Sequence, residues 1–418
     1  MAVAITSTDD IVRDGLCISC GLCAAISKPG EIEMGWTREG RLRPIEHMKP
    51  SFETLTAIEA TCPGLTTEGL AQEEAAEDAK NDPVWGWFSD GYLAWASNDE
   101  VRFKSSAGGV LNALAIYLLE NREVNFILHT GPDPDHPARS KWRISRNQED
   151  VLGSSGSRYG PSAPLEDLEE VLNRGEPFAF IGKPCDVGAL RLRTQHDERL
   201  EKLCKYRLAL VCGGASEFAK TKAVLDGWGV EEKDVSTLRY RGNGNPGPMR
   251  VQTRDGRSFE VTYNALWEDE STWQLQHRCK ICPDAIGEAA DLIVMDCWPG
   301  GGPTGEDEGF NALVTRTDKG NALAAVAIEA GAIVRGDDVG IEEMNDFQPH
   351  QVRKKLALWA RLAGQRAAGL RTMETTNLRI TELARTQTLN ALLTQARGTK
   401  YRAQQGRISE PTPKPAEE

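Results

Sequence analysis

The sequence predicts a mixed fold, partly α+β and partly α/β, with a cysteine-rich N-terminal segment and a helical C-terminal region. Three observations support this prediction. Four of the ten cysteines lie within the first 65 residues, short apolar runs alternate with helical patterns in the middle of the chain, and amphipathic helical patterns return after about residue 345. Strands separated by helical segments favour a sheet covered by helices. At 418 residues, the chain is long enough for two or three domains.

The composition argues against several classes of protein. The formal net charge is −13, and nucleic-acid binding needs a basic surface, so no nucleic-acid partner is expected. No run approaches eighteen apolar residues, so no membrane span or membrane partner is expected. The first residues lack the basic and apolar regions of a secretion signal, which favours a cytoplasmic protein. In that reducing compartment, spaced cysteines more often bind metal than form disulfides.

Residues 1–65 hold a pattern typical of an iron–sulfur site. Cys17, Cys20 and Cys23 form a C-x2-C-x2-C run, and Cys62 directly precedes a proline. A loop with this tight spacing can bind three irons of a [4Fe-4S] cluster, and the remote cysteine can bind the fourth. Four thiolates also suit zinc. We expect one ferredoxin-like [4Fe-4S] segment, with a zinc site as the alternative.

The next segments are defined by changes of pattern. Residues 66–83 are acidic and alanine-rich, which predicts a linker or a short exposed helix. The chain then alternates strand and helix patterns, and we divide this part into two cores, at 84–194 and 195–345. A helix packed on a sheet is predicted over 110–120. Short buried strands are predicted within 124–131, 177–184, 206–214 and 289–296.

A second group of cysteines is connected to two of these strands. Cys185 and Cys212 each end an apolar run that should be a strand, and Cys279 and Cys282 form a CxxC pair. If the two strands are neighbours, both thiols reach one rim of the sheet, and the CxxC loop can complete four ligands. Buried single cysteines are usually inert core residues, so spacing alone leaves both possibilities open. The two cysteines outside both groups are expected to be structural or free thiols: Cys204 and Cys297.

Two glycine-rich stretches are candidates for cofactor binding. Small and hydroxyl residues directly precede the predicted helix: Ser105, Ser106, Gly108 and Gly109. Amides and hydroxyls at a helix N-terminus favour phosphate, although serine also caps helices routinely and glycine eases turns. Residues 242–247, GNGNPG, match G-x-G-x-x-G, but Pro246 and Pro248 prevent the helix that a dinucleotide fingerprint must open. We expect a rigid turn there instead.

The end of the chain is predicted to be helical and then disordered. Residues 350–370 and 377–396 have amphipathic helical patterns, so 346–396 is expected to be a helical appendage or a surface for a partner. Residues 397–418 are polar and proline-rich, so a disordered tail is expected. No histidine joins a convincing catalytic set, and no catalytic residue is assigned.

Taken in order, these motifs resemble the family of the beta subunit of coenzyme F420-reducing hydrogenase and dehydrogenase. The shared features are the cysteine-rich start, SSAGGV at 105–110, the proline–cysteine turn, YRGNGNPG at 240–247, and CKIC before EAADL. EDEGFNALVTRTDKG, at 306–320, is similar to the family's C-terminal stretch. The resemblance covers about residues 10–335, and its specificity lies in the common order of the motifs.

The resemblance implies an FAD-dependent oxidoreductase with two [4Fe-4S] clusters, in which 84–194 and 195–345 are the family's N-terminal and C-terminal cores. The second cluster would be held by Cys185, Cys212, Cys279 and Cys282. The residues near FAD would be Ser105, Ser106, Gly108, Gly109, Arg241, Gly242, Asn243 and Gly244. A one-electron donor, reduced ferredoxin or a similar carrier, would feed the clusters, and FAD would pass electrons to a small organic acceptor.

Three alternatives stay open beside this ferredoxin-linked reductase. Because members of the family act on F420, the chain could be an F420-dependent oxidoreductase. The C-terminal helices also suit a non-catalytic electron-transfer subunit docked to a partner subunit. A zinc-stapled structural protein is the third alternative. The chain also resembles, distantly, the ferredoxin-dependent chlorophyll-pathway reductases. Its segment after the CxxC pair, PDAIGEAADL, departs from theirs, so tetrapyrrole reduction is not expected.

Overall fold

One eight-stranded mixed sheet forms the centre of the computed structural model, which describes residues 4–268 and 274–416. Its strands are Gly91–Ala96 (β6), Phe126–Pro132 (β7), Ser140–Ser145 (β8), Phe178–Gly182 (β9), Cys204–Leu210 (β10), Leu292–Asp296 (β14), Asn311–Thr315 (β15) and Ile333–Asp338 (β16). They lie in the order β16-β6-β15-β14-β10-β9-β7-β8. The neighbours β7, β9, β10 and β14 are parallel, and the outer pairs are antiparallel. The predicted mixed α/β fold is confirmed.

Both faces of this sheet are buried, which explains the continuous apolar runs in the sequence. In β9, Phe178 and Phe180 belong to one hydrophobic core, whereas Ala179 belongs to the core on the other face. The first face is covered by Leu168–Asn173 (α7), Pro184–Thr194 (α8) and Glu198–Leu203 (α9), and the second by Val110–Glu120 (α5), Gln148–Gly153 (α6) and Asp318–Glu329 (α13). The bounds of α5 match the predicted helix at 110–120.

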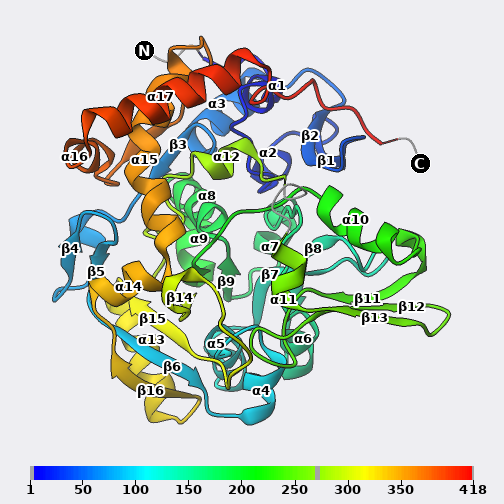
Figure 1. Cartoon of the computed structure of the whole chain (residues 1–418), viewed down its shortest axis with the longest axis vertical. Helices are drawn as coiled ribbons and strands as arrows, with labels where there is room; N and C mark the ends of the chain where they lie inside the picture. The colour runs from blue at the N-terminus through cyan, green and yellow to red at the C-terminus, as the bar shows by residue number, and fades with distance from the viewer. Residues whose placement is uncertain (1–3, 269–273, 417–418) are drawn as a thin grey trace.

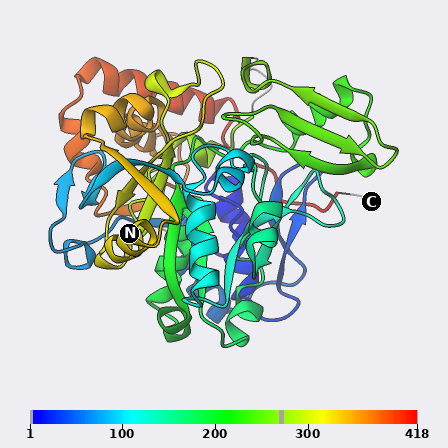
Figure 2. The ribbon, with the colours of Figure 1, turned by 90° about the horizontal axis from the view of Figure 1, so that it is seen from below.

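A smaller antiparallel sheet extends from one side of the molecule (Figures 1 and 2). It consists of Val235–Arg239 (β11), Met249–Thr253 (β12) and Ser258–Val261 (β13), and it packs with Ala219–Gly227 (α10) around a core of its own. Further short helical segments are Asp99–Lys104 (α4), Glu232–Asp234 (η2), Tyr263–Glu268 (α11), His277–Lys280 (α12) and Pro299–Gly301 (η4).

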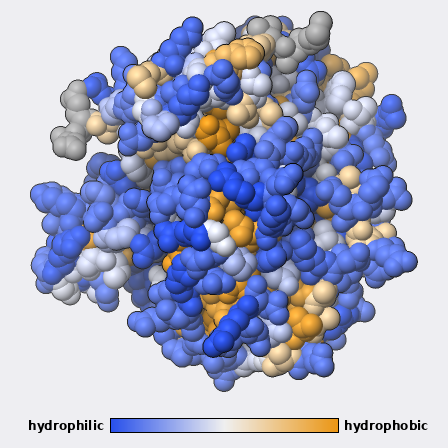
Figure 3. Space-filling model, turned by 180° about the vertical axis from the view of Figure 1, so that it is seen from behind, coloured by the Kyte–Doolittle hydropathy of each residue, from blue (hydrophilic) through white to orange (hydrophobic). Residues whose placement is uncertain are grey.

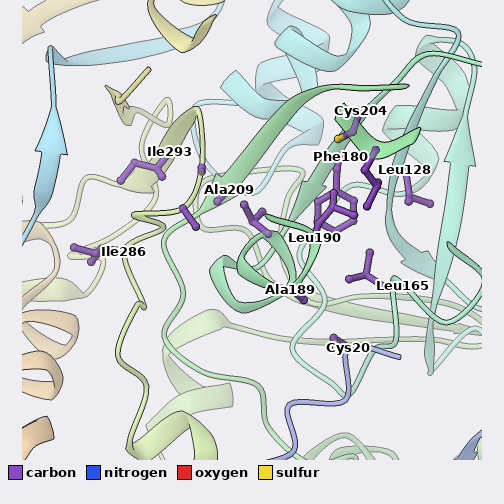
Figure 4. Packing of buried hydrophobic residues seen from close by; sticks show 14 of the residues in the cluster. Cys20, Leu128, Leu165, Phe180, Ala189, Leu190, Cys204, Ala209, Ile286 and Ile293 are labelled. Carbon is purple, nitrogen blue, oxygen red and sulfur yellow. The ribbon is translucent and has the colours of Figure 1, made fainter. Parts of the chain in front are cut away.

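The N-terminal segment packs on the central core. It contains Thr8–Arg13 (α1), Leu22–Ala25 (α2), the antiparallel pair Ile32–Trp36 (β1) and Leu42–Glu46 (β2), and Phe52–Thr61 (α3). Cys20 lies at the edge of the hydrophobic cluster that contains Leu165 and Phe180 (Figure 4). The Leu165 amide donates to the Cys20 carbonyl at 2.9 Å, so the cysteine loop is fixed to the core.

The acidic segment at 66–83 differs from the expected linker or short exposed helix. It contains Thr66–Glu68 (β3), the 3-10 turn Gln72–Glu74 (η1) and Lys80–Asp82 (β4), which pairs with Gly86–Phe88 (β5). β3 pairs in parallel with Glu374–Thr376 (β17) from the C-terminal region. This segment therefore joins the N-terminal part of the chain to the C-terminal region through the β3–β17 pair, which the composition of 66–83 does not predict.

The C-terminal region is helical, as expected, with one difference. Its helices are Ile341–Phe347 (α14), Pro349–Arg366 (α15), Ile380–Arg385 (α16) and Leu389–Gln404 (α17). The single helix expected at 377–396 is divided into α16 and α17 because the Thr388 side chain accepts a hydrogen bond from the Ala391 amide and starts a new helix. α15 and α17 pack together beside the N-terminal segment (Figure 1).

The tail differs from the disordered segment expected at 397–418. α17 continues to Gln404, and Ile408 is buried. Beyond it, the Glu410 carboxylate accepts hydrogen bonds from Arg43, and Pro415 forms a β-bridge with Thr37. Polar groups of the tail therefore form hydrogen bonds with the N-terminal segment.

The expected boundary at 194/195 does not interrupt the central sheet, because strands from both sides of it pair with one another. Within the described residues, no helix is long and apolar enough to cross a lipid bilayer. The face seen from behind is mostly hydrophilic, with apolar residues gathered in a few separate patches (Figure 3).

Candidate functional site

The first cysteine set surrounds one cavity. Cys17 and Cys20 lie in the loop after α1, Cys23 lies in α2, and Cys62 ends α3; all four line the cavity as free thiols. The end of α3 is thus brought beside the loop and α2, which lie well before it in the sequence. Within the described ranges, no group of three or more His, Cys, Asp or Glu side chains is arranged to hold a single metal ion. The four thiols are placed around a space instead.

Backbone conformation shapes this cysteine loop. Ser19 has a φ of 65° and Gly21 a φ of 85°, both in the left-handed region. A Cβ at Gly21 would lie 2.7 Å from the Glu166 backbone nitrogen, so only glycine fits there. The turn aims the Ser19 amide at the Cys17 sulfur, 3.4 Å away. Amide–sulfur hydrogen bonds of this kind stabilise a thiolate that binds metal.

Burial makes these thiols hard to ionise without a bound cation. Burial raises the pKa of Cys62 to about 11 and raises the pKa of Cys20 well above its usual value. Repulsion from neighbouring thiolates, including Cys17 for Cys62 and Cys62 for Cys20, adds to the effect of burial. Bound metal reverses this balance, because a thiolate ligand is stabilised directly by the positive charge.

The second cysteine set comes from two neighbouring strands and the CxxC loop. β9 and β10 are parallel neighbours, so the condition set by the sequence pattern is met. Cys185 lies in the first turn of α8, directly after β9, and Cys212 follows β10 by two residues. The Cys212 amide donates to the Ala285 carbonyl at 2.9 Å, which holds it beside the loop that follows Cys282.

Further contacts draw the four members of this second set together. The Ala215 amide points at the Cys279 sulfur, 3.4 Å away. Burial raises the pKa of Cys212 to about 12, and repulsion from Cys279 and Cys282 contributes. Burial likewise raises the pKa of Cys185, with Cys212 and Cys282 among the charges that reach it. Cys212 and Cys282 therefore each lie within electrostatic reach of the other three thiols.

Two lysines lie next to the second set, and neither of them is assigned a role from the sequence. Lys183 pairs with Asp186 at 2.6 Å and donates to Ser162 at 2.8 Å. Lys354, on α15, donates to the Gly213 carbonyl at 3.0 Å. Burial raises the pKa of the Cys212 thiol, and the positive charges of both lysines lower it. Lys183 directly precedes the proline–cysteine turn, whereas only the folded chain brings Lys354 to this place.

The remaining cysteines lie apart from both sets. Cys204 is fully buried in the hydrophobic core at the start of β10, and burial raises its pKa to about 11. The Cys297 thiol follows β14 and lies 3.9 Å from the Met295 carbonyl. Neither thiol has another cysteine among the charges that shift its pKa.

A cleft of about 1190 Å³ adjoins the second set, with Cys212 and Cys279 in its wall. Pockets for small molecules and cofactors usually measure about 300–1,000 Å³. Four of the residues expected near a flavin line this cleft: Ser105, Ser106, Gly109 and Arg241. The other four do not line it: Gly108, Gly242, Asn243 and Gly244.

The serine and glycine residues before α5 have separate roles. Gly109 is the N-cap of α5 and provides no side chain to cap the helix, and the first helical amide, that of Val110, donates instead to the Asn311 side chain at 3.3 Å. The Ser105 hydroxyl donates to the Val101 carbonyl and accepts from Asn112, which is a local role. Gly108 allows close packing on the sheet, because a Cβ there would lie 2.8 Å from the Asn311 backbone nitrogen.

The GNGNPG stretch is a turn that directly follows Arg241, a residue of the cleft wall. The Gly242 amide donates to the Pro246 carbonyl at 3.1 Å, and a Cβ at Gly242 would lie 2.7 Å from the Lys104 carbonyl oxygen. Arg241, just before the turn, donates to the Ser106 carbonyl and pairs with Asp296 at 2.8 Å. The turn therefore holds the arginine in the cleft wall and connects the two glycine-rich stretches.

Aromatic rings form another part of the cleft wall. Tyr159, Tyr263, Trp267 and Trp298 all line it. Tyr159 and Trp267 meet edge to face at 4.9 Å, as do Tyr263 and Trp298 at 5.4 Å. The Arg241 guanidinium lies 4.6 Å from the Trp298 ring centre. Flat apolar faces beside a fixed cation suit a planar ring system that also carries negative charge.

His277, two residues before Cys279, leads to a prediction about pH. It is buried, its Nε2 lies 2.8 Å from Oε1 of Gln365, and burial lowers its pKa to about 4. The unfolded chain takes up the proton near pH 6.5, and the folded chain only near pH 4. The free energy of unfolding should therefore fall as the pH drops through this window, by up to about 3 kcal/mol.

Urea unfolding of the wild type and of His277→Gln between about pH 7 and pH 4 measures this effect. The variant is expected to lose less stability over the window than the wild type does. Equal slopes in the two proteins would contradict a neutral buried histidine at this position.

Two family models match the part of the chain that contains most of the central sheet. The family model for the N-terminus of the coenzyme F420 hydrogenase/dehydrogenase beta subunit matches residues 91–169. The model for the C-terminus of the same subunit matches residues 175–337. Together these two segments cover more than half of the chain and contain seven of the eight strands of the central sheet completely.

Individual relatives are distant. The beta subunit of coenzyme F420 hydrogenase from Methanococcus voltae is 22% identical over 255 residues, which cover 60% of this chain and 84% of that protein. A subunit of the F(420)H(2) dehydrogenase from Methanosarcina mazei is 20% identical over 344 residues, covering 80% of this chain and 88% of that protein. Both alignments extend over most of the relative's length.

A solved structure shows the same fold. A chain of the F420-reducing [NiFe] hydrogenase complex from Methanosarcina barkeri superimposes with a TM-score of 0.51 at 20% identity, covering 66% of this chain and 92% of that chain. The C-terminal helices lie outside the residues that the family models match. With both of its core segments matched, the chain belongs to the family of the beta subunit of coenzyme F420 hydrogenase/dehydrogenase.

Proposed function

We propose that this chain is a cytoplasmic electron-transfer subunit of beta type, part of a larger oxidoreductase, which holds two [4Fe-4S] clusters and one FAD. The main observation behind the proposal is that the fold gathers four thiols twice from distant parts of the sequence. One set lies in the N-terminal segment, and the other combines two thiols that follow the parallel strands β9 and β10 with the CxxC pair. Because Cys212 and Cys279 line the cleft, the second set would lie nearer to a flavin bound there.

The donor sets fit iron–sulfur clusters. Cys17, Cys20, Cys23 and Cys62 would hold the first cluster, and Cys185, Cys212, Cys279 and Cys282 the second. A zinc ion needs its four thiolates about 2.3 Å from one point, whereas a cubane cluster takes one thiolate at each of four irons. The cavity that the four thiols of the first set line supports a cubane cluster at that set. The amides of Ser19 and Ala215 provide hydrogen bonds to the ligand sulfurs.

The cleft fits a flavin nucleotide. The N-terminus of α5 would receive phosphate oxygens at amides other than that of Val110, which Asn311 already satisfies, with Ser106 and Gly109 beside it. Arg241, held by Asp296, would fix negative charge on the ligand, and the tyrosine and tryptophan rings would contact its flat surface. When bound, FAD accepts or donates two electrons and exchanges single electrons with iron–sulfur clusters. We assign no proton donor.

Relatives support a partner subunit. Those compared above are named as subunits of F420 hydrogenase and of F(420)H(2) dehydrogenase, and the superimposed chain comes from a complex. A second candidate is a self-sufficient reductase that takes electrons from ferredoxin. The size of the cleft favours that candidate, because it exceeds a usual cofactor pocket and leaves room for an organic acceptor beside FAD.

Purification of a tagged chain from its own host, without oxygen, separates these functions. The subunit proposal predicts a second polypeptide at constant stoichiometry through two columns, and no turnover of organic acceptors by the isolated chain. Reduction of an acceptor by the isolated chain with reduced ferredoxin would instead establish the self-sufficient reductase. Bleaching of oxidised F420 by the reduced chain would identify F420 as the redox partner. Cys204→Ser, outside both thiol sets, should behave as the wild type in each assay.

A further inference from the structure

A network of buried polar contacts connects the C-terminal tail to the first cysteine set. The Glu410 carboxylate accepts two hydrogen bonds from the Arg43 guanidinium, at 2.7 and 2.8 Å. The exposed fractions of these side chains are 1% for Arg43 and 9% for Glu410. This is a bidentate ion pair out of reach of bulk water, so its charges are poorly screened.

Arg43 continues toward the cysteine loop. Its Nη1 donates to the Ser19 hydroxyl at 2.7 Å, and the Ser19 amide points at the Cys17 sulfur at 3.4 Å. Only one residue therefore separates the guanidinium from a predicted ligand of the first cluster. Arg43 and Glu410 both lie outside residues 91–337, which contain the segments matched by the family models.

The same carboxylate also contacts Arg41, which lies just before β2. Arg41 lies 3.3 Å from Glu410 and donates to the buried Glu217 at 2.7 Å. Glu217 belongs to the segment that follows Cys212. Arg41 thus links the tail to the segment that contains Glu217, but it is not among the groups that act on the Cys17 thiol.

We propose that Glu410 is a positioning residue for the first cluster: it fixes Arg43 beside Cys17 and offsets its charge, and so sets the reduction potential of that cluster. This inference rests on the proposed function, because it requires a cluster at the first cysteine set. Reduction adds one negative charge to a cluster, so a nearby uncompensated cation favours the reduced form. A carboxylate beside the cation weakens that effect.

The two members of the pair should therefore act in opposite directions. Glu410→Gln leaves Arg43 without its counter-charge, and the midpoint potential of the first cluster should rise. Arg43→Gln leaves the carboxylate without its cation, and the potential should fall. The double variant removes both charges and should return toward the wild-type value. Arg43→Lys keeps the charge and should stay close to the wild type.

Redox titration of the full-length holoprotein, followed by electron paramagnetic resonance, measures these potentials. The second cluster serves as an internal reference, and Arg41→Gln as a matched control that loosens the tail without removing a charge that acts on Cys17. Opposite shifts confined to the first cluster support the inference. Shifts in one direction for both single variants, no shift, or an equal shift in Arg41→Gln would overturn it.

Two further outcomes are decisive. If Glu410→Gln does not fold, the midpoint potential of the first cluster in Arg43→Gln is compared with that in Arg43→Lys. A lower potential in Arg43→Gln alone supports a charge effect. Equal potentials in the two variants overturn it. A wild-type protein without any cluster signal would overturn the proposed function itself. Clusters that are present but insensitive to Arg43 and Glu410 would overturn this inference alone.

Discussion

Glu288→Gln should lower the free energy of unfolding by about 3–5 kcal/mol, the usual cost of breaking a buried ion pair from one side. The Glu288 side chain is 1% exposed and contacts the Lys355 ammonium and the Arg379 guanidinium, which are 4% and 12% exposed. Its removal leaves two cations in a low-dielectric interior with no carboxylate between them. Lys355 lies on α15 and Arg379 caps α16, so the substitution should also loosen the C-terminal helices.

Urea unfolding followed by circular dichroism measures the effect, with Glu382→Gln as the matched control. Glu382 is exposed on α16, and its substitution should change the free energy of unfolding by less than about 0.5 kcal/mol. Faster limited proteolysis of α15 to α17 in Glu288→Gln would show which region responds. A loss in Glu288→Gln no larger than that of the control would contradict the structural role assigned to this carboxylate.

Single cysteine substitutions should remove one cluster at a time. Cys62→Ala is expected to lose about four of about eight irons and retain the second cluster, because a cubane that lacks its fourth protein ligand is poorly held. Cys282→Ala is expected to lose the other four irons and retain the first cluster. Cys204→Ala should retain all of the iron, since its thiol lies in the hydrophobic core and belongs to neither set.

Iron and acid-labile sulfide analysis of proteins purified without oxygen measures these losses. The two cluster variants should also keep different electron paramagnetic resonance signals. Unchanged iron in Cys282→Ala would remove the second set from the proposal and leave the first. Loss of iron in Cys204→Ala would mean that the two sets are assigned wrongly.

The parts of the fold with strong local patterns could be predicted from the sequence. The apolar spacing of 110–120 matched the bounds of α5, and the buried runs before Cys185 and Cys212 are strands, although the sequence left open whether these two strands are neighbours. The C-x2-C-x2-C spacing placed three thiols of the first set around one cavity, two in a loop and the third, Cys23, in α2. In each of these cases, the residues that determine the structure are close together in the chain.

The features that were missed depend on contacts between distant residues. β6 lies between β15 and β16, which follow it by more than two hundred residues, and no local pattern specifies that insertion. The Arg43–Glu410 pair spans 367 residues, so the tail was expected to be disordered. Gly108 matched a phosphate-binding pattern for a different reason, since its missing side chain allows close packing on the sheet.

The most direct test of the two-cluster proposal is the composition of the protein as purified without oxygen: iron, sulfide, zinc and flavin per chain, together with the visible spectrum. The proposal predicts a brown protein with about eight irons, about eight sulfides and one FAD. A protein with about four irons would contradict one of the two thiol sets. A colourless protein that carries zinc and no flavin would contradict electron transfer altogether.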